Sequence, residues 1–199
     1  IDESIRKFKE NIIQRHTKEI YQEYLLSNSV WYFENFKKVS NPNIYDEFKR
    51  YISRNLEIHP TNISIVGSGK IGFSTSPKKM FKPFSEESDL DIVLVDNRKF
   101  HFYWNEYLNQ YKKGSWIFNY QEVSSSVFRK FISFNGFHKG SDIYNNWIKR
   151  TDSLNKDLQT QFDIEHKVNY RIFESWDAVE TYYLSNFNKI KEELIKENS

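Results

Sequence analysis

The sequence predicts an α/β (α+β) fold in which a small mixed sheet packs against N- and C-terminal helices. Apolar residues recur at helical spacing near both ends of the chain, whereas short β-rich runs surround a glycine-rich turn in its middle. The length of 199 residues fits a single domain. We expect an N-terminal helical part (1–58), a core (59–175) and a C-terminal helix (176–199).

The composition narrows the class of protein. Hydrophobic residues make up 38%, and they include 17 Phe, 13 Tyr and 5 Trp, whose large rings can build a core for a domain of this size. No apolar run approaches the roughly 20 residues that span a membrane, so no membrane partner is expected. The net charge of only +2 argues against a long nucleic-acid channel, and no DNA partner is expected. The absence of cysteine excludes thiolate chemistry and fits a cytoplasmic protein.

The first third of the chain predicts helices. From about Ser4 to Leu26, apolar residues recur at helical spacing, and Ser27-Asn28-Ser29 ends that run. A short aromatic stretch follows at 31–36. Asn41 then suits the N-cap of a second helix and Pro42 its first position.

The middle of the chain predicts two strands. Residues 62–66 form a short β-rich run, and the glycine-rich turn 67–72 follows at once. Residues 73–88 contain Pro77, Pro83 and several Ser and Thr, which predict an irregular loop. Residues 89–95 predict a second strand that is apolar after its paired acids, as a central buried strand is.

The last part alternates between helix and strand signals. Residues 100–111 predict a helix that Gly114 stops, and residues 123–134 and 142–158 also look helical. Residues 161–173 alternate between apolar and polar, which predicts a strand with one polar face. That face would carry Asp163, Glu165, Lys167, Asn169 and Arg171. Ser175 suits the N-cap of a final helix.

The stretch from Gly67 to Asp91 carries the clearest chemical signal, and three interpretations compete for it. Its G-x-G-x-x-G pattern matches a dinucleotide site, but the prolines that follow exclude the long helix such a site needs. A P-loop needs glycine and Ser/Thr where this chain has Ser64 and Ile71.

The third interpretation treats the turn and the acids as one site. Residues two apart on a strand point to the same side, so Asp89 and Asp91 can present both carboxylates to one place while Leu90 enters the core. Converging carboxylates repel each other unless cations neutralise them. Mg²⁺ is the usual partner of such oxygen ligands, and it leaves coordination positions open for phosphates.

This order of strand, Gly67-Ser68 turn, loop and Asp89-Leu90-Asp91 triplet resembles the DNA polymerase β-like nucleotidyltransferases. The resemblance covers about residues 62–96, and the loop of 20 residues between Ser68 and Asp89 is longer than in the minimal members. It implies a sheet of the polymerase β-like type. It also implies the transfer of a nucleoside monophosphate from an NTP to an acceptor hydroxyl, with ATP as the expected NTP. Asp89 and Asp91 would bind two Mg²⁺ ions, and Gly67 and Ser68 would hold the triphosphate.

The remaining site residues are less plainly marked. The family places a third carboxylate on a later strand, for which Asp163 is our first candidate, Glu165 the second, and Glu122 a third if residues 116–123 form a strand. We also assign Lys70, Lys167 and Arg171 to the nucleotide. An exposed face of ordinary charges explains the acids of residues 161–173 equally well. The lysines at 78, 79 and 82 of the loop could reach phosphates or be solvated, and solvation is slightly favoured for each.

What the acceptor is stays open among protein, RNA and small molecules, because fold does not choose among them. Size and resemblance suggest a bacterial enzyme of a toxin–antitoxin or phage-defence system, with a possible protein partner. The rival hypothesis is a catalytically silent member of the same fold that acts as a nucleotide sensor or regulatory module. The five histidines show no metal-ligand spacing, and each is expected to be a surface or a satisfied core residue.

Overall fold

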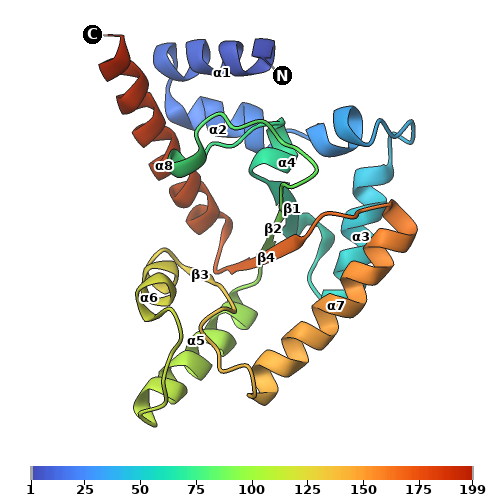
Figure 1. Cartoon of the computed structure of the whole chain (residues 1–199), viewed down its shortest axis with the longest axis vertical. Coiled ribbons are helices and arrows are strands. Elements are labelled where there is room, and N and C mark those ends of the chain that lie inside the picture. The colour runs from blue at the N-terminus through green and yellow to red at the C-terminus, as the bar shows by residue number, and fades with distance from the viewer. Residues whose placement is uncertain (1, 199) are drawn as a thin grey trace.

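A four-stranded mixed sheet lies between two groups of helices in the computed structural model, which describes residues 2–198 (Figure 1). The sheet order is β1-β2-β4-β3, in which β2 and β4 run parallel and the two outer pairs run antiparallel. The strands are β1 (Ile63–Val66), β2 (Leu90–Val95), β3 (Phe131–Ile132) and β4 (Val168–Phe173). The predicted α/β class with a small mixed sheet is confirmed.

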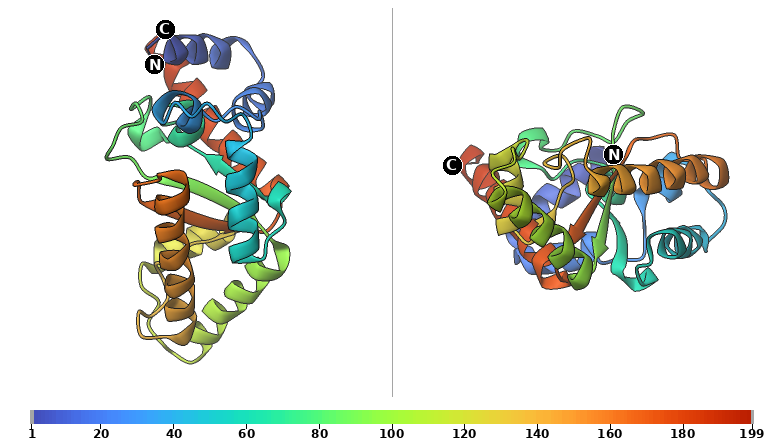
Figure 2. Two further views of the ribbon diagram at one scale, coloured as in Figure 1. Left: turned by 90° about the vertical axis from the view of Figure 1, so that its right-hand side faces the viewer. Right: turned by 90° about the horizontal axis from the view of Figure 1, so that it is seen from below.

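One face of the sheet is covered by helices from both ends of the chain. These are α1 (Asp2–Gln14), α2 (Thr17–Leu25) and α8 (Trp176–Glu197), together with the short α4 (Ser68–Ile71). The rings of Phe8, Phe73 and Phe187 meet here, with centroids 5.3 and 5.7 Å from that of Phe8. As a result α1 and α8 lie side by side at one end of the molecule (Figure 2).

The other face is covered by the middle of the chain. Its helices are α3 (Ile44–Leu56), α5 (Asn97–Lys112) and α7 (Asp142–Phe162), with a π-turn, η1 (Tyr32–Phe36), and α6 (Tyr120–Phe128) beside β3. Two short 3₁₀ turns, η2 (Pro60–Asn62) and η3 (Pro77–Lys79), complete the chain. Successive side chains of β2 enter opposite cores. Leu90, Ile92 and Leu94 enter this second core, whereas Val93 and Val95 enter the first.

Several predicted boundaries are confirmed and others are wrong. Ser175 caps α8, where its Oγ accepts a hydrogen bond from the Ala178 backbone N–H. The expected helix from about 4 to 26 is two helices, because His16 takes an extended conformation and caps α2. The second helix begins at Ile44 rather than at Pro42. Asn41 instead accepts a hydrogen bond from the Asn43 N–H in the turn before it.

The predicted strand at 161–173 is wrong in its first half. Helix α7 continues through Phe162 because its apolar positions keep a helical period against the core. Asp163 then ends the helix with a left-handed φ of 54°, and β4 begins only at Val168. The helix predicted at 123–134 ends at Phe128, and β3 takes part of the remainder. Among residues 2–198, no helix is both long and apolar enough to cross a bilayer.

Candidate functional site

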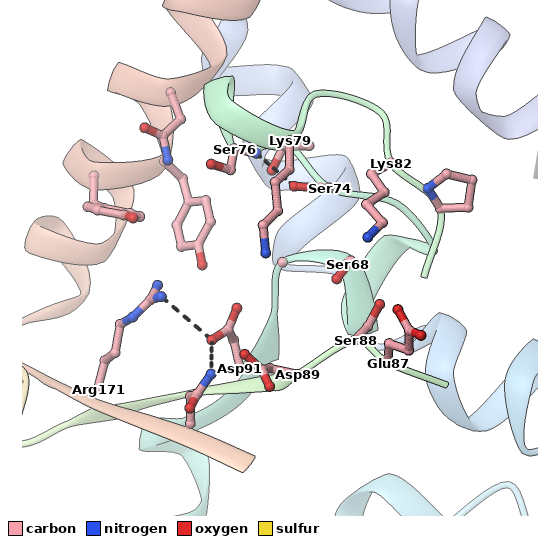
Figure 3. Close-up of a pocket in the computed structure, with 17 residues that line it drawn as sticks. Ser68, Ser74, Ser76, Lys79, Lys82, Glu87, Ser88, Asp89, Asp91 and Arg171 are labelled. Atoms are coloured by element: carbon pink, nitrogen blue, oxygen red, sulfur yellow. Dashed lines mark hydrogen bonds and ion pairs between the residues drawn. The ribbon is translucent and has the colours of Figure 1, made fainter. Parts of the chain in front are cut away.

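The main candidate site is a polar cavity of about 270 Å³ beside the N-terminal ends of β2 and β4 (Figure 3). The Gly67-Ser68 turn, the loop that follows it and one side of α8 enclose the cavity. It is lined by Gly67, Ser68, Ser74, Thr75, Ser76, Lys79, Lys82, Pro83, Glu87, Ser88, Asp89, Asp91, Asn169, Arg171, Tyr182, Tyr183 and Asn186. The turn and the aspartate pair therefore meet in one pocket, as the third interpretation of the sequence predicted.

The pleat of β2 aims both carboxylates into this pocket. Asp89 and Asp91 line the cavity, while the side chain of Leu90 between them is fully buried in the opposite core. The start of the strand is held in place because the Leu90 N–H donates to the Lys167 carbonyl. His166 is buried and its Nδ1 lies 2.9 Å from the Ser88 carbonyl, so it is a satisfied core histidine.

Gly67 brings the turn directly onto Asp91. Its φ of +63° and ψ of −146° belong to a region that essentially only glycine adopts. A Cβ added at this position would lie 3.3 Å from Oδ2 of Asp91. The backbone conformation therefore favours glycine here, and a larger residue would also press against the Asp91 carboxylate.

The neighbouring strand β4 supplies the direct partners of Asp91. Asn169 lies opposite Asp91 in the parallel register, and its Nδ2 donates a long hydrogen bond of 3.5 Å to Oδ1. An Arg171 guanidinium nitrogen lies 3.6 Å from the same oxygen, and the Asp91 side chain is only 26% exposed. Both contacts are at the long end of their ranges, so the pocket can loosen them at modest cost.

Burial is the largest influence on the pKa values of Asp91, Arg171 and Tyr183. It raises the pKa of Asp91, although Arg171, the Asn169 hydrogen bond and Lys79 act in the opposite direction. Burial is the largest single influence on Arg171 and works against its charged form. The combined effect of Asp91, Tyr183, Tyr182 and Glu122 outweighs it, so the pKa of Arg171 is raised. Tyr183 is buried at the back of the pocket, and burial raises the pKa of its hydroxyl well above 10.

Two lysines of the loop face the aspartate pair. The loop folds back on itself, with backbone hydrogen bonds from Ser74 N–H to Lys82 O and from Phe81 N–H to Ser74 O. In Figure 3 the ammonium groups of Lys79 and Lys82 extend toward Ser68 and the two acids. Both residues are exposed, as solvated lysines are, yet both line the cavity, whereas Lys78 does not.

Lys70 is buried away from the pocket and has a structural role. Its side chain is 3% exposed, and its Nζ donates hydrogen bonds to the backbone carbonyls of Ser27 and Ser29. Burial lowers the pKa of Lys70 to about 8, while the charge of Glu34 opposes that shift. The lysine ties the turn to the segment after α2, so the structure does not bring it to the nucleotide-binding set to which it was assigned.

The proposed third carboxylates do not join the aspartate pair. Asp163 is 76% exposed at the end of α7, where it forms an ion pair with Lys37. Glu165 and Lys167 are exposed and do not line the pocket. Glu122 lies on helix α6 rather than on a strand, and accepts a hydrogen bond from Asn135.

The donor set fits Mg²⁺ that arrives with a nucleotide. Within the part of the chain that is described, no three His, Cys, Asp or Glu side chains converge to hold a metal ion by themselves. Mg²⁺, however, is often bound by one or two carboxylates plus substrate phosphates, with waters in the remaining positions. Asp89 and Asp91 meet that requirement, but a second ion would lack the expected ligand from Asp163.

Tyr182, Tyr183 and Asn186 of α8 are pocket residues that sequence reasoning missed as site residues. Helical periodicity shows that such residues share a face but does not show which cavity that face meets. Asn169 was placed on the polar face of its strand, and only the strand register places it opposite Asp91.

Comparisons of the chain with protein families, curated proteins and solved structures find no match.

Proposed function

We propose that the protein is a Mg²⁺-dependent nucleotidyltransferase of the DNA polymerase β-like type. It would move a nucleoside monophosphate from an NTP, with ATP as the first choice, to an acceptor hydroxyl. The observation that carries this proposal is the convergence of the Gly67-Ser68 turn, the Asp89 and Asp91 carboxylates and the two loop lysines on one polar cavity.

The charges of the pocket support a triphosphate with its metal. Three cationic side chains line it, Lys79, Lys82 and Arg171, against three acidic ones, Glu87, Asp89 and Asp91. A purely acidic cavity would repel the phosphates, and a purely basic one would not hold the metal. The mixed set suits a substrate whose phosphate charge is partly neutralised by Mg²⁺.

Each part of the pocket has a role in this proposal. The Gly67 backbone and the Ser68 hydroxyl would hold the β- and γ-phosphates, with Lys79 and Lys82 adding charge. Asp89 and Asp91 would hold the metal, which when bound supplies charge neutralisation and orientation for the phosphates. The acceptor oxygen would form a bond to the α-phosphorus as the bond to the bridging oxygen breaks, and pyrophosphate would leave. The proton of the acceptor hydroxyl would pass to a base that the pocket does not single out.

A second candidate function, a catalytically silent nucleotide-binding module, is favoured by one observation. The β4 position opposite Asp91 carries an amide, Asn169, and Arg171 pairs with the same carboxylate. Such a site would still bind the nucleotide through the turn and the lysines. The guanidinium of Arg171 would occupy part of the space that the metal needs beside Asp91. It would serve as a sensor or regulatory partner.

The two functions are separated by transfer of label from α-³²P NTPs. The protein is incubated with Mg²⁺ and each NTP in turn, with cell extract as the acceptor pool. Asp91→Asn tests the site, and Asp163→Asn is the matched control because Asp163 is an exposed aspartate outside the pocket.

Label that moves with the wild type and Asp163→Asn but not with Asp91→Asn supports transfer and identifies the acceptor class. Binding of NTP without any transfer supports the silent module. A wild-type protein that binds no NTP would contradict both functions.

A further inference from the structure

The basic residues of this chain are unevenly distributed. Residues 98–150, which contain α6, β3, most of α5 and the start of α7, carry nine Lys or Arg and three Asp or Glu. The other residues carry the remaining 20 Lys or Arg and 24 Asp or Glu. The small net charge of the whole chain therefore hides one basic region, which we call the α5–α6 lobe (residues 98–150).

The same lobe holds the exposed rings of the described chain. Every large aromatic side chain that is prominently exposed in residues 2–198 lies between 102 and 128: Phe102, Tyr111, Trp116, Phe118, Tyr120 and Phe128. Trp116 is 76% exposed and Phe128 is 89% exposed. The rings of Tyr111 and Tyr120 lie nearly parallel, with centroids 6.4 Å apart. They help to line a groove of about 460 Å³ between α5 and α6.

The lobe adjoins the proposed active site. The guanidinium of Arg129, at the end of α6, lies over the ring of Tyr182, 5.2 Å from its centroid. Tyr182 in turn lines the pocket that holds the aspartate pair. The charge of Glu122 on α6 also helps to raise the pKa of Arg171. In Figure 1, α6 lies near the N-terminal end of α8, the helix that carries Tyr182.

We propose that the α5–α6 lobe binds a single-stranded polynucleotide, and that this strand is the acceptor. Exposed rings can stack on unpaired bases, and exposed lysines of the same lobe, such as Lys112 and Lys113, can neutralise the phosphates. Lys130 and Arg150 form ion pairs with Glu174 and Glu57 from outside the lobe, which leaves seven cations against three acids. A purely apolar protein partner would account for the rings but not for this excess of cations. A duplex would match the charge but keeps its bases stacked and unavailable to the rings. The acceptor role rests on the proposed function, whereas binding does not.

Binding is measured with the full chain carrying Asp91→Asn, so that turnover plays no part. Fluorescence anisotropy is followed with labelled 12-residue oligouridylate, oligothymidylate and a duplex of equal length, over a range of salt concentrations. Trp116→Ala with Phe128→Ala tests stacking, and Lys112→Ala with Lys113→Ala tests phosphate contacts. The matched control is Lys189→Ala with Lys196→Ala, two exposed lysines of α8 outside the lobe.

Loss of two stacking rings is expected to weaken single-strand binding about tenfold or more. Loss of the two lysines should lower the slope of log affinity against log salt by about 1.4, or about 0.7 for each lysine that contacts a phosphate. The control should bind as the parent does, and thermal melting should show that the exposed substitutions leave the fold intact. A preference between the two single strands would identify RNA or DNA as the source of the ligand.

The proposal is overturned if the ring variant binds as tightly as its parent, or if the duplex binds as well as the single strands. It is also overturned if oligoglutamate competes as effectively as the oligonucleotides, because the lobe would then be a general anion surface. Oligonucleotide binding with no label transfer by the wild-type protein would retain the binding surface and remove the proposed activity. Label transfer to a small molecule, with no oligonucleotide binding, would retain the activity and remove this acceptor.

Discussion

Strands β2 and β4 are neighbours in the sheet, yet they bring opposite chemistry to the same pocket. Strand β2 contributes Asp91, with Asp89 just before its start, whereas β4 contributes Asn169 and Arg171 to the same face. Asp91 and Asn169 are register partners, so the contrast occurs between facing positions. The acidic pair is therefore balanced by a cation of the protein itself, and an incoming metal would compete with Arg171 for Asp91.

The largest effect is expected from Gly67→Ala, because Gly67 lies against Asp91 of β2. The φ of +63° and the approach of its Cβ to Asp91 should together cost about 1–3 kcal/mol of unfolding free energy. Mg²⁺-dependent NTP binding should fall as well, because Asp91 must move. Gly114→Ala is the matched control, since it also has a positive φ, of +67°, but opens onto empty space. Equal effects of the two variants on NTP binding would show that the turn does not position Asp91.

Making β4 resemble β2 gives the next largest effect. Asn169→Asp places a third carboxylate opposite Asp91. We expect the Mg²⁺ concentration that half-saturates NTP binding to fall about tenfold, which corresponds to about 1.4 kcal/mol. Asn169→Ser is the control because it removes the amide without adding charge. An unchanged or higher Mg²⁺ requirement in the aspartate variant would mean that the metal does not bind between the two strands.

The loop lysines give a smaller effect on the nucleotide itself. Lys79→Ala removes one cation from the pocket and should weaken NTP binding about fivefold, or about 1 kcal/mol. Lys78 lies on the same 3₁₀ turn but does not line the cavity, so the Lys78→Ala variant should bind NTP with wild-type affinity. Isothermal titration with a non-hydrolysable NTP measures both. A larger loss in Lys78→Ala would place the phosphates elsewhere.

The smallest effect concerns pH. Because burial raises the folded-state pKa of Asp91 above its ordinary value of 3.8, the folded protein binds more protons than the unfolded chain between those two pKa values. The contribution of Asp91 to stability is thus present below pH 3.8 and is lost as pH rises through the folded pKa. Unfolding at a series of pH values should show this slope, and Asp91→Asn should remove it. An identical profile in the variant would mean that Arg171 cancels the effect of burial.

The geometry of the candidate site was predictable from sequence where a single local pattern decides it. The alternation Asp89-Leu90-Asp91 determines which side chains share a face, and the glycine-rich turn indicates a close backbone approach. The position of Asp163, the first candidate for a third carboxylate, was not predictable this way. Residues 161–173 alternate in polarity, but the helical period of α7 and its contacts with the core extend the helix to Phe162. Tertiary packing therefore overrides the local pattern, and Asp163 remains outside the pocket.

Lys70 and Lys79 show the same limit for charged residues. Both follow the Gly67-Ser68 turn within a dozen residues, and composition alone does not distinguish them. One is buried against the carbonyls of Ser27 and Ser29, and the other lines the pocket. That difference depends on contacts with a segment about 40 residues away in the chain, which no local window of sequence contains.

The contact of Phe8, Phe73 and Phe187 has a consequence for the order in which the candidate pocket is assembled as the chain is synthesised. Helix α8 leaves the ribosome after every element that it covers, and it carries both Phe187 and the pocket residue Tyr183. A nascent chain that has reached β4 already contains the aspartate pair and Arg171, but it lacks one wall of the cavity and exposes the rings of Phe8 and Phe73. The pocket is therefore completed only after α8 has been translated, and a chain released before α8 would carry the motif without the cavity.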